Sequence, residues 1–346
     1  MHAQSAIILC NSYTQQMAYL LFTVVPAQTK ILLNPHTLNE YWRNNLLSLT
    51  LDKNASRSCV HFSSSFIFHI SRLEFMLTKK QNDNVKPLKR YQYERYAVLC
   101  NLAYPRVFKQ TRYGFDPNGQ RIIKNEFGKT MIRVLWSKKR TEVVVVIKGS
   151  HSISDWLLNF AMWTRSCKRL GLNYRIHAGF YHLLFQESQP SRNEDRLGLS
   201  VIERLEATIV PLILQGKRIT ITGHSSGGAI GSVFADYIER KYPKSIKRVV
   251  TFGQPAIGDW TFRKRYGLGH KTYRICCDID IVTFMPPVPF LYWHVGKMLW
   301  LYNGRIYENT PTLMRLGRSL VSWLIRPFSY HLMSKYIRNK DFFDER

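Results

Sequence analysis

The chain has 346 residues, 45% of them hydrophobic and 13% aromatic, which excludes an intrinsically disordered protein and leaves room for two domains. Its 50 Lys and Arg residues outnumber 23 Asp and Glu residues, so the formal net charge is +27. Such a surface attracts an anionic partner, for example membrane phospholipid, nucleic acid or an acidic protein. The alternative is a basic composition that serves no specific partner.

Cysteine spacing and hydropathy exclude further classes of protein. The cysteines match neither a disulfide framework nor a zinc site, and the adjacent Cys276 and Cys277 should point to opposite faces of a strand as buried thiols. No apolar run reaches the ~18 residues that span a bilayer. The apolar run at 17–25 lacks preceding basic residues and a clear cleavage site. We therefore predict no signal peptide, and we expect a cytoplasmic or peripheral membrane protein.

Residues 1–85 show neither a period of 2 nor a period of 3.6 residues in their apolar positions. We expect this segment to be a poorly patterned N-terminal extension that is disordered or not translated. In the second case Met76 is the start of the protein. Residues 86–346 are expected to form the folded domain.

The folded domain begins with a predicted helix over 89–105, which ends at Pro105. Residues 130–150 predict a β-hairpin with a polar turn at 137–141. Its second strand, EVVVVIKG, is nearly all Val and Ile, which is typical of a strand covered on both faces.

Strands and helices then alternate as far as residue 278. The predicted elements are helices beginning near 176 and over 199–217 and 229–242, and strands over 218–222, 246–255 and 270–278. This order predicts an α/β fold with a mainly parallel central sheet covered by helices on both faces.

The sequence GHSSG at 223–227 joins a predicted strand to a predicted helix and fits the pattern G-x-S-x-G. A chain that turns from strand to helix within about one residue strains the central residue and presents its side chain at the carboxyl end of the sheet. Gly223 and Gly227 lack Cβ atoms, so strand and helix can approach closely. An ordinary glycine turn is the alternative, but the flanking elements favour an elbow that exposes the Ser225 hydroxyl.

A serine hydroxyl needs a base to activate it and an acid to orient that base. In α/β-hydrolases the acid follows the serine in the chain and the base comes last. Composition and spacing leave several candidates open. The acids are Asp259, Asp278 and Asp280, and the bases are His270, His294 and His331.

Four stretches together resemble the class 3 lipase family, whose members have an α/β-hydrolase fold. They are VVVVIKGSHSISDWLLNF, IHAGFYHLL, ITGHSSGGAIGSVFADYI and DIDIVTFMPP, and the resemblance covers roughly residues 90–345. It implies Ser225 as the nucleophile, Asp280 as the acid and His331 as the base. Thr283 stands where the family usually has proline, which should loosen the turn after the acid.

The resemblance also implies an oxyanion hole, formed by the backbone N–H of Ser226 and by Ser150. It places a lid over 154–163, where Trp156, Leu157, Leu158 and Phe160 are candidates for contact with a lipid surface. A core helix is the alternative for this segment. A second apolar stretch with arginines, 314–328, is either interfacial or an ordinary surface helix.

The implied function is serine-dependent hydrolysis of fatty acyl esters of glycerolipids, as in a triacylglycerol lipase or carboxylesterase, without cofactor or metal. One alternative is a phospholipase A1-like activity on anionic phospholipids, which the net charge favours. Another is a non-catalytic member of the fold that binds lipid or protein. We expect transient contact with an anionic membrane or lipid surface and no nucleic acid partner, because no known recognition module is present.

Overall fold

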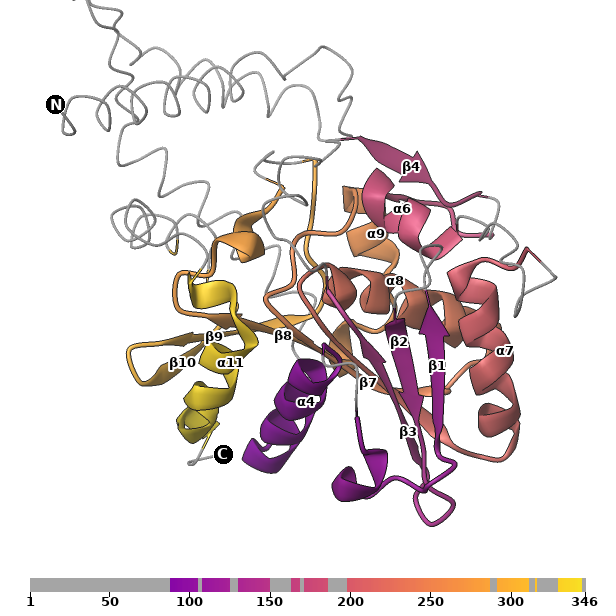
Figure 1. Cartoon of the computed structure of the whole chain (residues 1–346). Coiled ribbons are helices and arrows are strands. Elements are labelled where there is room, and N and C mark those ends of the chain that lie inside the picture. Colours follow the sequence, from indigo (N-terminus) through magenta and orange to yellow (C-terminus); the bar gives the residue numbers. More distant parts are fainter. Residues whose placement is uncertain are drawn as a thin grey trace, which may run out of the picture. The chain divides into compact units, whose positions relative to one another are not determined.

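The computed structural model of the chain describes residues 88–104, 108–124, 130–149, 163–168, 171–185, 198–286, 291–310, 315 and 329–343 (Figure 1). The predicted extension over 1–85 lies outside these ranges, so the domain boundary at residue 86 stays a prediction. Within the described ranges, no helix combines the length and apolar character that crossing a bilayer requires.

Helices and strands alternate along the described part of the chain, as the sequence predicts. The helices are α4 (Arg90–Leu102), α6 (Ala178–Phe185), α7 (Val201–Leu214), α8 (Ser226–Lys241), α9 (Trp260–Arg265) and α11 (Met333–Arg338). The strands are β1 (Gln120–Lys124), β2 (Thr130–Leu135), β3 (Glu142–Ile147), β4 (Thr164–Ser166), β5 (Arg175–His177), β6 (Arg218–His224), β7 (Ile246–Phe252), β8 (Thr272–Cys277), β9 (Lys297–Tyr302) and β10 (Arg305–Glu308). Single 3-10 turns are η1 (Gln110–Tyr113), η3 (Gly269–Lys271), η4 (Ile281–Phe284), η5 (Ser329–His331) and η6 (Asn339–Phe343).

One eight-stranded sheet organises the described domain, in the order β1-β2-β3-β6-β7-β8-β9-β10. The central strands β3, β6, β7, β8 and β9 pair in parallel, and β1, β2 and β10 add antiparallel pairs at the two edges. The predicted α/β fold with a mainly parallel sheet is therefore confirmed.

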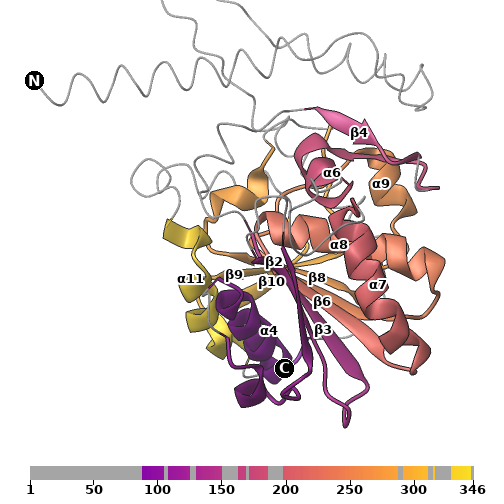
Figure 2. The same ribbon diagram turned by 45° about the vertical axis from the view of Figure 1, so that its right-hand side comes forward.

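Side chains of β3 alternate between two apolar layers, one on each face of the sheet. Val143, Val145 and Ile147 pack in the layer formed with α6, α7 and α8. Val144 and Val146 pack in the opposite layer with α4 and α11, which Figures 1 and 2 show on the other face. Burying each such side chain contributes roughly 1.5–3 kcal/mol. The nearly continuous Val and Ile run follows from this two-sided coverage.

Both neighbouring cysteines of β8 are buried free thiols, and they lie in different apolar clusters. Cys276 packs beside Met298 and Trp300, whereas Cys277 lies in the layer of α4 and α11. The prediction that the two side chains point to opposite faces is confirmed.

The hairpin of β9 and β10 was not predicted from the sequence, although its turn carries a clear signal. Asn303 and Gly304 occupy the turn with φ angles of 48° and 71°. Positive φ at both central residues is the requirement of a type I′ turn, and Asn-Gly is its favoured pair. The strand β1 was also missed, because it is only five residues long and its two adjacent isoleucines give no alternation.

Glu142, at the start of β3, joins the helix α4 to the strands β6 and β7. Its Oε1 accepts hydrogen bonds from Tyr96 Oη of α4 at 3.0 Å and from Thr220 Oγ1 of β6 at 2.7 Å, and Lys247 Nζ of β7 lies 3.2 Å away. Burial alone would raise the pKa of this carboxyl. The Thr220 hydrogen bond and the Lys247 ammonium outweigh burial and lower the pKa below its ordinary value of 4.5.

Replacing Glu142 with Gln should therefore cost about 1–3 kcal/mol of unfolding free energy near neutral pH. Because the folded-state pKa lies below the unfolded one, the carboxylate stabilises the fold above about pH 4.5, and this contribution disappears as the pH falls through the folded value. Urea unfolding near pH 7 and near pH 3 measures both effects. Glu308→Gln, which removes a surface pair with Lys297, is the control and should cost less than about 1 kcal/mol. Equal losses for the two variants at neutral pH would contradict the assignment.

Candidate active site

The strand β6 and the helix α8 meet at Ser225, whose φ of 58° and ψ of −132° are strained for a residue with a side chain. The two flanking glycines allow this turn. A Cβ on Gly227 would lie 2.4 Å from the carbonyl oxygen of Ile147, and one on Gly223 would lie 2.5 Å from the carbonyl oxygen of Gly227. Strand, turn and helix therefore form the sharp elbow that the sequence pattern describes.

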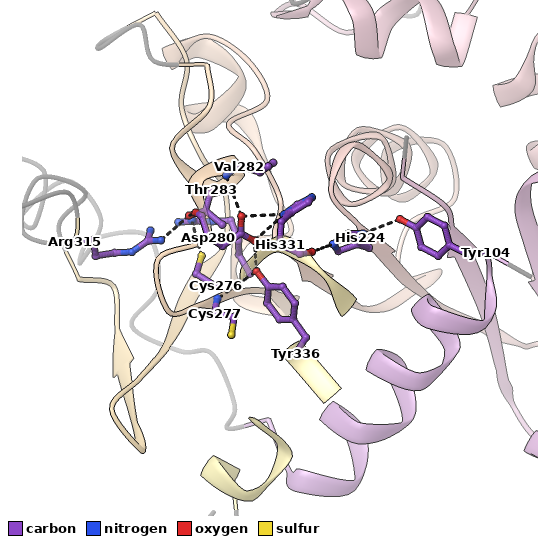
Figure 3. Close-up of polar contacts among 11 residues, drawn as sticks. Tyr104, His224, Cys276, Cys277, Asp280, Val282, Thr283, Arg315, His331 and Tyr336 are labelled. Carbon is purple, nitrogen blue, oxygen red and sulfur yellow. Dashed lines mark hydrogen bonds and ion pairs between the residues drawn. The ribbon is translucent and has the colours of Figure 1, made fainter. Parts of the chain in front are cut away.

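The Asp280 carboxylate and the His331 imidazole form a buried pair on the loops after β8 and before α11. Both Asp280 oxygens lie 2.9 Å from His331 Nδ1, and both side chains are completely buried (Figure 3). The pairing directs Nδ1 to the carboxylate, so Nε2 is the nitrogen available for proton transfer. Nε2 is itself buried, without a hydrogen-bond partner in the described part of the chain.

Two further donors fix the orientation of the Asp280 carboxylate. The backbone N–H of Val282 donates to Oδ1 at 3.0 Å, and the hydroxyl of Tyr336 from α11 donates to Oδ2 (Figure 3). Burial raises the pKa of Tyr336 well above 10, and the nearby Asp280 carboxylate raises it further, so the phenol keeps its proton. Tyr336 lies five residues after His331 in the sequence, but its contact with the acid could not be read from that spacing.

The residue before Ser225, His224, packs against this pair. The rings of His224 and His331 lie against each other at a tilt of 32°, with centroids 4.4 Å apart. The backbone N–H of Ser225 donates to the carbonyl of Phe252 at 2.9 Å, and a Cβ on the next residue, Gly253, would lie 2.7 Å from Asp280 Oδ2. The structure thus pairs two of the three residues that the resemblance implied, Asp280 and His331, and places the residue before Ser225 against His331. The catalytic roles of the three residues stay a prediction.

The other candidate acids and bases lie elsewhere. Asp259 caps α9 by accepting the Phe262 backbone N–H at 2.7 Å. His270 is exposed on η3, and the Nε2 of His294 lies 3.1 Å from the carbonyl oxygen of Thr283. Asp278 occupies a turn with a φ of 49°. Among the described residues, His331 pairs with Asp280 and with none of these alternatives.

Thr283 does not loosen the turn after the acid, contrary to the expectation from the missing proline. Its hydroxyl donates to the carbonyl oxygen of Asp280 at 2.7 Å and accepts from the buried Arg315 Nη2 at 2.6 Å. The threonine therefore supplies two fixed contacts where a proline ring would supply none.

Of the residues predicted for the oxyanion hole and the lid, Ser226 is among those that the structure describes. Ser226 is the first residue of α8. The first backbone N–H groups of a helix have no partner within the helix, and they favour a negative charge beside them. The other oxyanion candidate, Ser150, and the lid candidates Trp156, Leu157, Leu158 and Phe160 lie outside the described residues, so they remain predictions. Ser225 is 4% exposed in this structure.

Two site residues were missed by sequence reasoning, which treated His224 as the variable position of the elbow motif and Tyr104 as the end of a helix. His224 Nδ1 lies 2.7 Å from Tyr104 Oη, and Nε2 lies 2.7 Å from the carbonyl oxygen of His331 (Figure 3). Burial, assisted by the neighbouring His331, lowers the pKa of His224 to about 3. Within the described residues no cluster of three or more His, Cys, Asp or Glu could hold a metal ion.

Comparison with known proteins identifies the fold and the family that the chain resembles. The family model for lipase (class 3) matches residues 144–290, which confirms the predicted resemblance over this range. The lipase Lip2 of Yarrowia lipolytica superimposes with a TM-score of 0.51 at 18% identity, covering 71% of this chain and 92% of Lip2. The chain thus has an α/β-hydrolase fold.

Two curated relatives extend the likeness in sequence. A secreted mono- and diacylglycerol lipase of Fusarium solani is 28% identical over 179 residues, which cover 49% of this chain and 47% of the relative. A phospholipase A1 of Oryza sativa is 25% identical over 202 residues, covering 53% of this chain and 48% of the relative. The chain therefore spans about half the length of these relatives.

The depressed pKa of His224 predicts a pH-dependent contribution to stability. Between about pH 6.5 and pH 3 the unfolded chain binds a proton at His224 that the folded protein does not, so stability falls as the pH falls. At pH 5 this costs about 2 kcal/mol. Unfolding free energies measured in urea near pH 7.5 and pH 5 should decrease less for His224→Asn than for the wild-type protein. The exposed His270→Asn should follow the wild type, and identical pH dependence of all three proteins would contradict the buried neutral state of His224.

Proposed function

We propose that this chain, whose residues 144–290 match the class 3 lipase model, is a serine hydrolase that cleaves fatty acyl esters of acylglycerols. The observation that carries the proposal is the buried pair of Asp280 and His331, which packs against the residue that precedes the strained Ser225. The acylglycerol substrate is supported by the name of the Fusarium relative.

The proposed reaction has two steps, formation of an acyl-enzyme and its hydrolysis, and both use Ser225, His331 and Asp280. His331 Nε2 takes the proton of the Ser225 hydroxyl, and the Ser225 oxygen attacks the ester carbonyl carbon. Asp280 holds the imidazole at Nδ1 and stabilises its charged form. Collapse of the tetrahedral intermediate breaks the ester bond, and His331 returns the proton to the leaving alcohol. Water, deprotonated by the same nitrogen, then releases the fatty acid from the acyl-enzyme and restores Ser225.

Backbone donors complete the proposed chemistry. The negative oxygen of the tetrahedral intermediate would be held by the N–H of Ser226, at the start of α8, and by Ser150. Each donor fixed in place before the charge develops is worth about 10²–10³ in rate. Because Ser225 is buried here, the proposal also requires a covering segment to move before a lipid ester can enter, the role predicted for residues 154–163.

A second candidate substrate, anionic phospholipid, is favoured by one surface of the domain. A hydrogen-bonded strip runs from β4 through β5 to Gly258 and Trp293. Two exposed tryptophans flank it, Trp163 (76% exposed) directly before β4 and Trp260 (40% exposed) at the start of α9, where the Trp260 ring packs against that of Trp293. The phospholipase A1 named among the relatives supports the same candidate.

Cations accompany the exposed tryptophans, and we name this set of residues the β4 face. The exposed basic residues are Arg165, Lys168 and Arg175. Aromatic side chains favour the boundary between water and lipid, and each cation near an anionic surface adds about 1 kcal/mol of attraction. The β4 face is therefore suited to contact with an anionic lipid surface.

Replacing Ser225 with Ala should lower ester hydrolysis at least about 10⁴-fold, because the nucleophile is lost while the fold is kept. Turnover of a diacylglycerol emulsion measures the loss. A serine-reactive phosphonate followed by peptide mapping should label position 225 in the wild-type protein and nothing in the variant. Ser245→Ala, which truncates a buried hydroxyl without a partner in the described residues, should keep both activity and label. Undiminished hydrolysis by Ser225→Ala would refute the proposal.

The choice between neutral and anionic substrates depends on salt and on the β4 face. If phospholipid is the substrate, turnover of phosphatidylglycerol vesicles should fall several-fold as salt screens the charges, whereas diacylglycerol turnover should change little. The double variant Arg165→Gln/Lys168→Gln should reproduce this fall at low salt. The matched control Lys138→Gln/Lys139→Gln removes the same charge from the β2–β3 turn, at the opposite end of the central strands. Faster turnover of diacylglycerol at every salt concentration would assign the neutral substrate.

A further inference from the structure

The His224 side chain bridges two segments on either side of the candidate site. Its Nε2 contacts the backbone carbonyl of His331, and its Nδ1 contacts the hydroxyl of Tyr104, both at 2.7 Å (Figure 3). A carbonyl oxygen only accepts hydrogen bonds, so Nε2 must carry the proton. In the neutral ring Nδ1 is then an acceptor, and the Tyr104 hydroxyl must donate to it.

The Tyr104 oxygen extends this series of contacts to the backbone after β3. Burial raises the pKa of Tyr104, and a hydrogen bond from the backbone N–H of Gly149 opposes that shift. A Cβ on Gly149 would lie 3.0 Å from Tyr104 Oη and 2.9 Å from Ser225 Cβ, so the three residues are packed against one another. The hydrogen bonds therefore run in one direction, from Gly149 through Tyr104 and His224 to His331.

We propose that Tyr104 and His224 are positioning residues that hold the backbone of His331 in fixed relation to the backbone of Gly149 across the site. The inference rests on the proposed function, because Gly149 precedes the oxyanion candidate Ser150 and His331 carries the base. Asp280 controls only the imidazole of His331, from Nδ1. The hydrogen bond from His224 holds the main chain of His331, which lies in the single 3-10 turn η5.

A neutral ring at position 224 suits this role. The adjacent rings of His224 and His331 would repel each other if both were charged, and the proposed reaction charges His331. Because His224 remains neutral down to about pH 3, it keeps its two hydrogen bonds while the neighbouring ring takes and returns a proton. A misplacement of about 1 Å in such a site can cost about 10²-fold in rate.

A pair of amide variants separates the two contacts of His224. In His224→Gln the side-chain amide reaches the position of Nε2 and still donates to the His331 carbonyl. In His224→Asn the shorter amide reaches only the position of Nδ1 and keeps the contact with Tyr104. Tyr104→Phe removes the donor to Nδ1. Tyr266→Phe is the control, because it removes a buried tyrosine hydroxyl that contacts Thr272 instead.

Steady-state hydrolysis of p-nitrophenyl butyrate, a soluble ester, tests the proposal. We expect kcat of His224→Asn to fall about 10- to 100-fold with KM nearly unchanged, kcat of His224→Gln to stay within about 5-fold of wild type, and Tyr104→Phe to be intermediate. Tyr266→Phe should retain wild-type kcat. Equal losses for the Gln and Asn variants, or losses in KM alone, would overturn the proposal.

Proton NMR of the same variants gives a readout that does not need turnover. The proton on His331 Nδ1, hydrogen-bonded to Asp280, should give a low-field resonance. Both amide variants lose the neighbouring ring and its effect on shielding, so we expect the resonance of His224→Asn to differ from that of His224→Gln, a shift in Tyr104→Phe, and none in Tyr266→Phe. Coincident resonances of the two amide variants, with an unmoved resonance in Tyr104→Phe, would also overturn the positioning role. If instead the wild-type protein neither hydrolyses the ester nor reacts with a phosphonate, the proposed function fails, and the NMR pattern still decides whether Tyr104 and His224 position His331.

Discussion

The close contact between the start of α8 and the end of β3 is the constraint on which the site depends. Gly227 approaches the carbonyl oxygen of Ile147 so nearly that a single added carbon would overlap it. This contact forces the chain to turn within one residue, and Ser225 takes up the strain. The same turn sets His224 against His331 and starts a helix beside the serine. A bulkier residue at 227 would therefore disturb the serine, the base and the helix terminus together.

Buried polar contacts, more than apolar packing, determine where the loops of the site lie. The loop after β8 is held by the backbone and hydroxyl donors to Asp280. The turn before α11 is held at His331, through its imidazole by Asp280 and through its backbone carbonyl by His224. Water is excluded from these contacts, so each is stronger than on the surface, and each leaves a costly unpaired group if its partner is lost. The apolar layers on both faces of the sheet supply stability without selecting one loop conformation.

The sequence predicted the fold and the elbow because both depend on local patterns. The Val run of β3 indicates a strand buried on both faces, and the glycines around Ser225 indicate a tight turn. Asp280 and His331 needed the resemblance to a family, since residues 51 positions apart carry no mutual spacing signal. The roles of Tyr104 and His224 could not be predicted, because their contacts join residues 107 and 120 positions apart. The Asn303–Gly304 turn, in contrast, was a local signal that reasoning overlooked.

Thr283 shows why agreement with a family average is a poor guide at this position. A designer who compared this chain with class 3 lipases would restore the usual proline after the acid, expecting a stiffer loop. Proline has no hydroxyl, so the exchange would take away an acceptor of the Arg315 guanidinium, which is buried between the rings of Phe284 and Trp300. Thr283 and Arg315 therefore depend on each other. A substitution of Thr283 should be tolerated only together with a compensating substitution of Arg315, and the reverse.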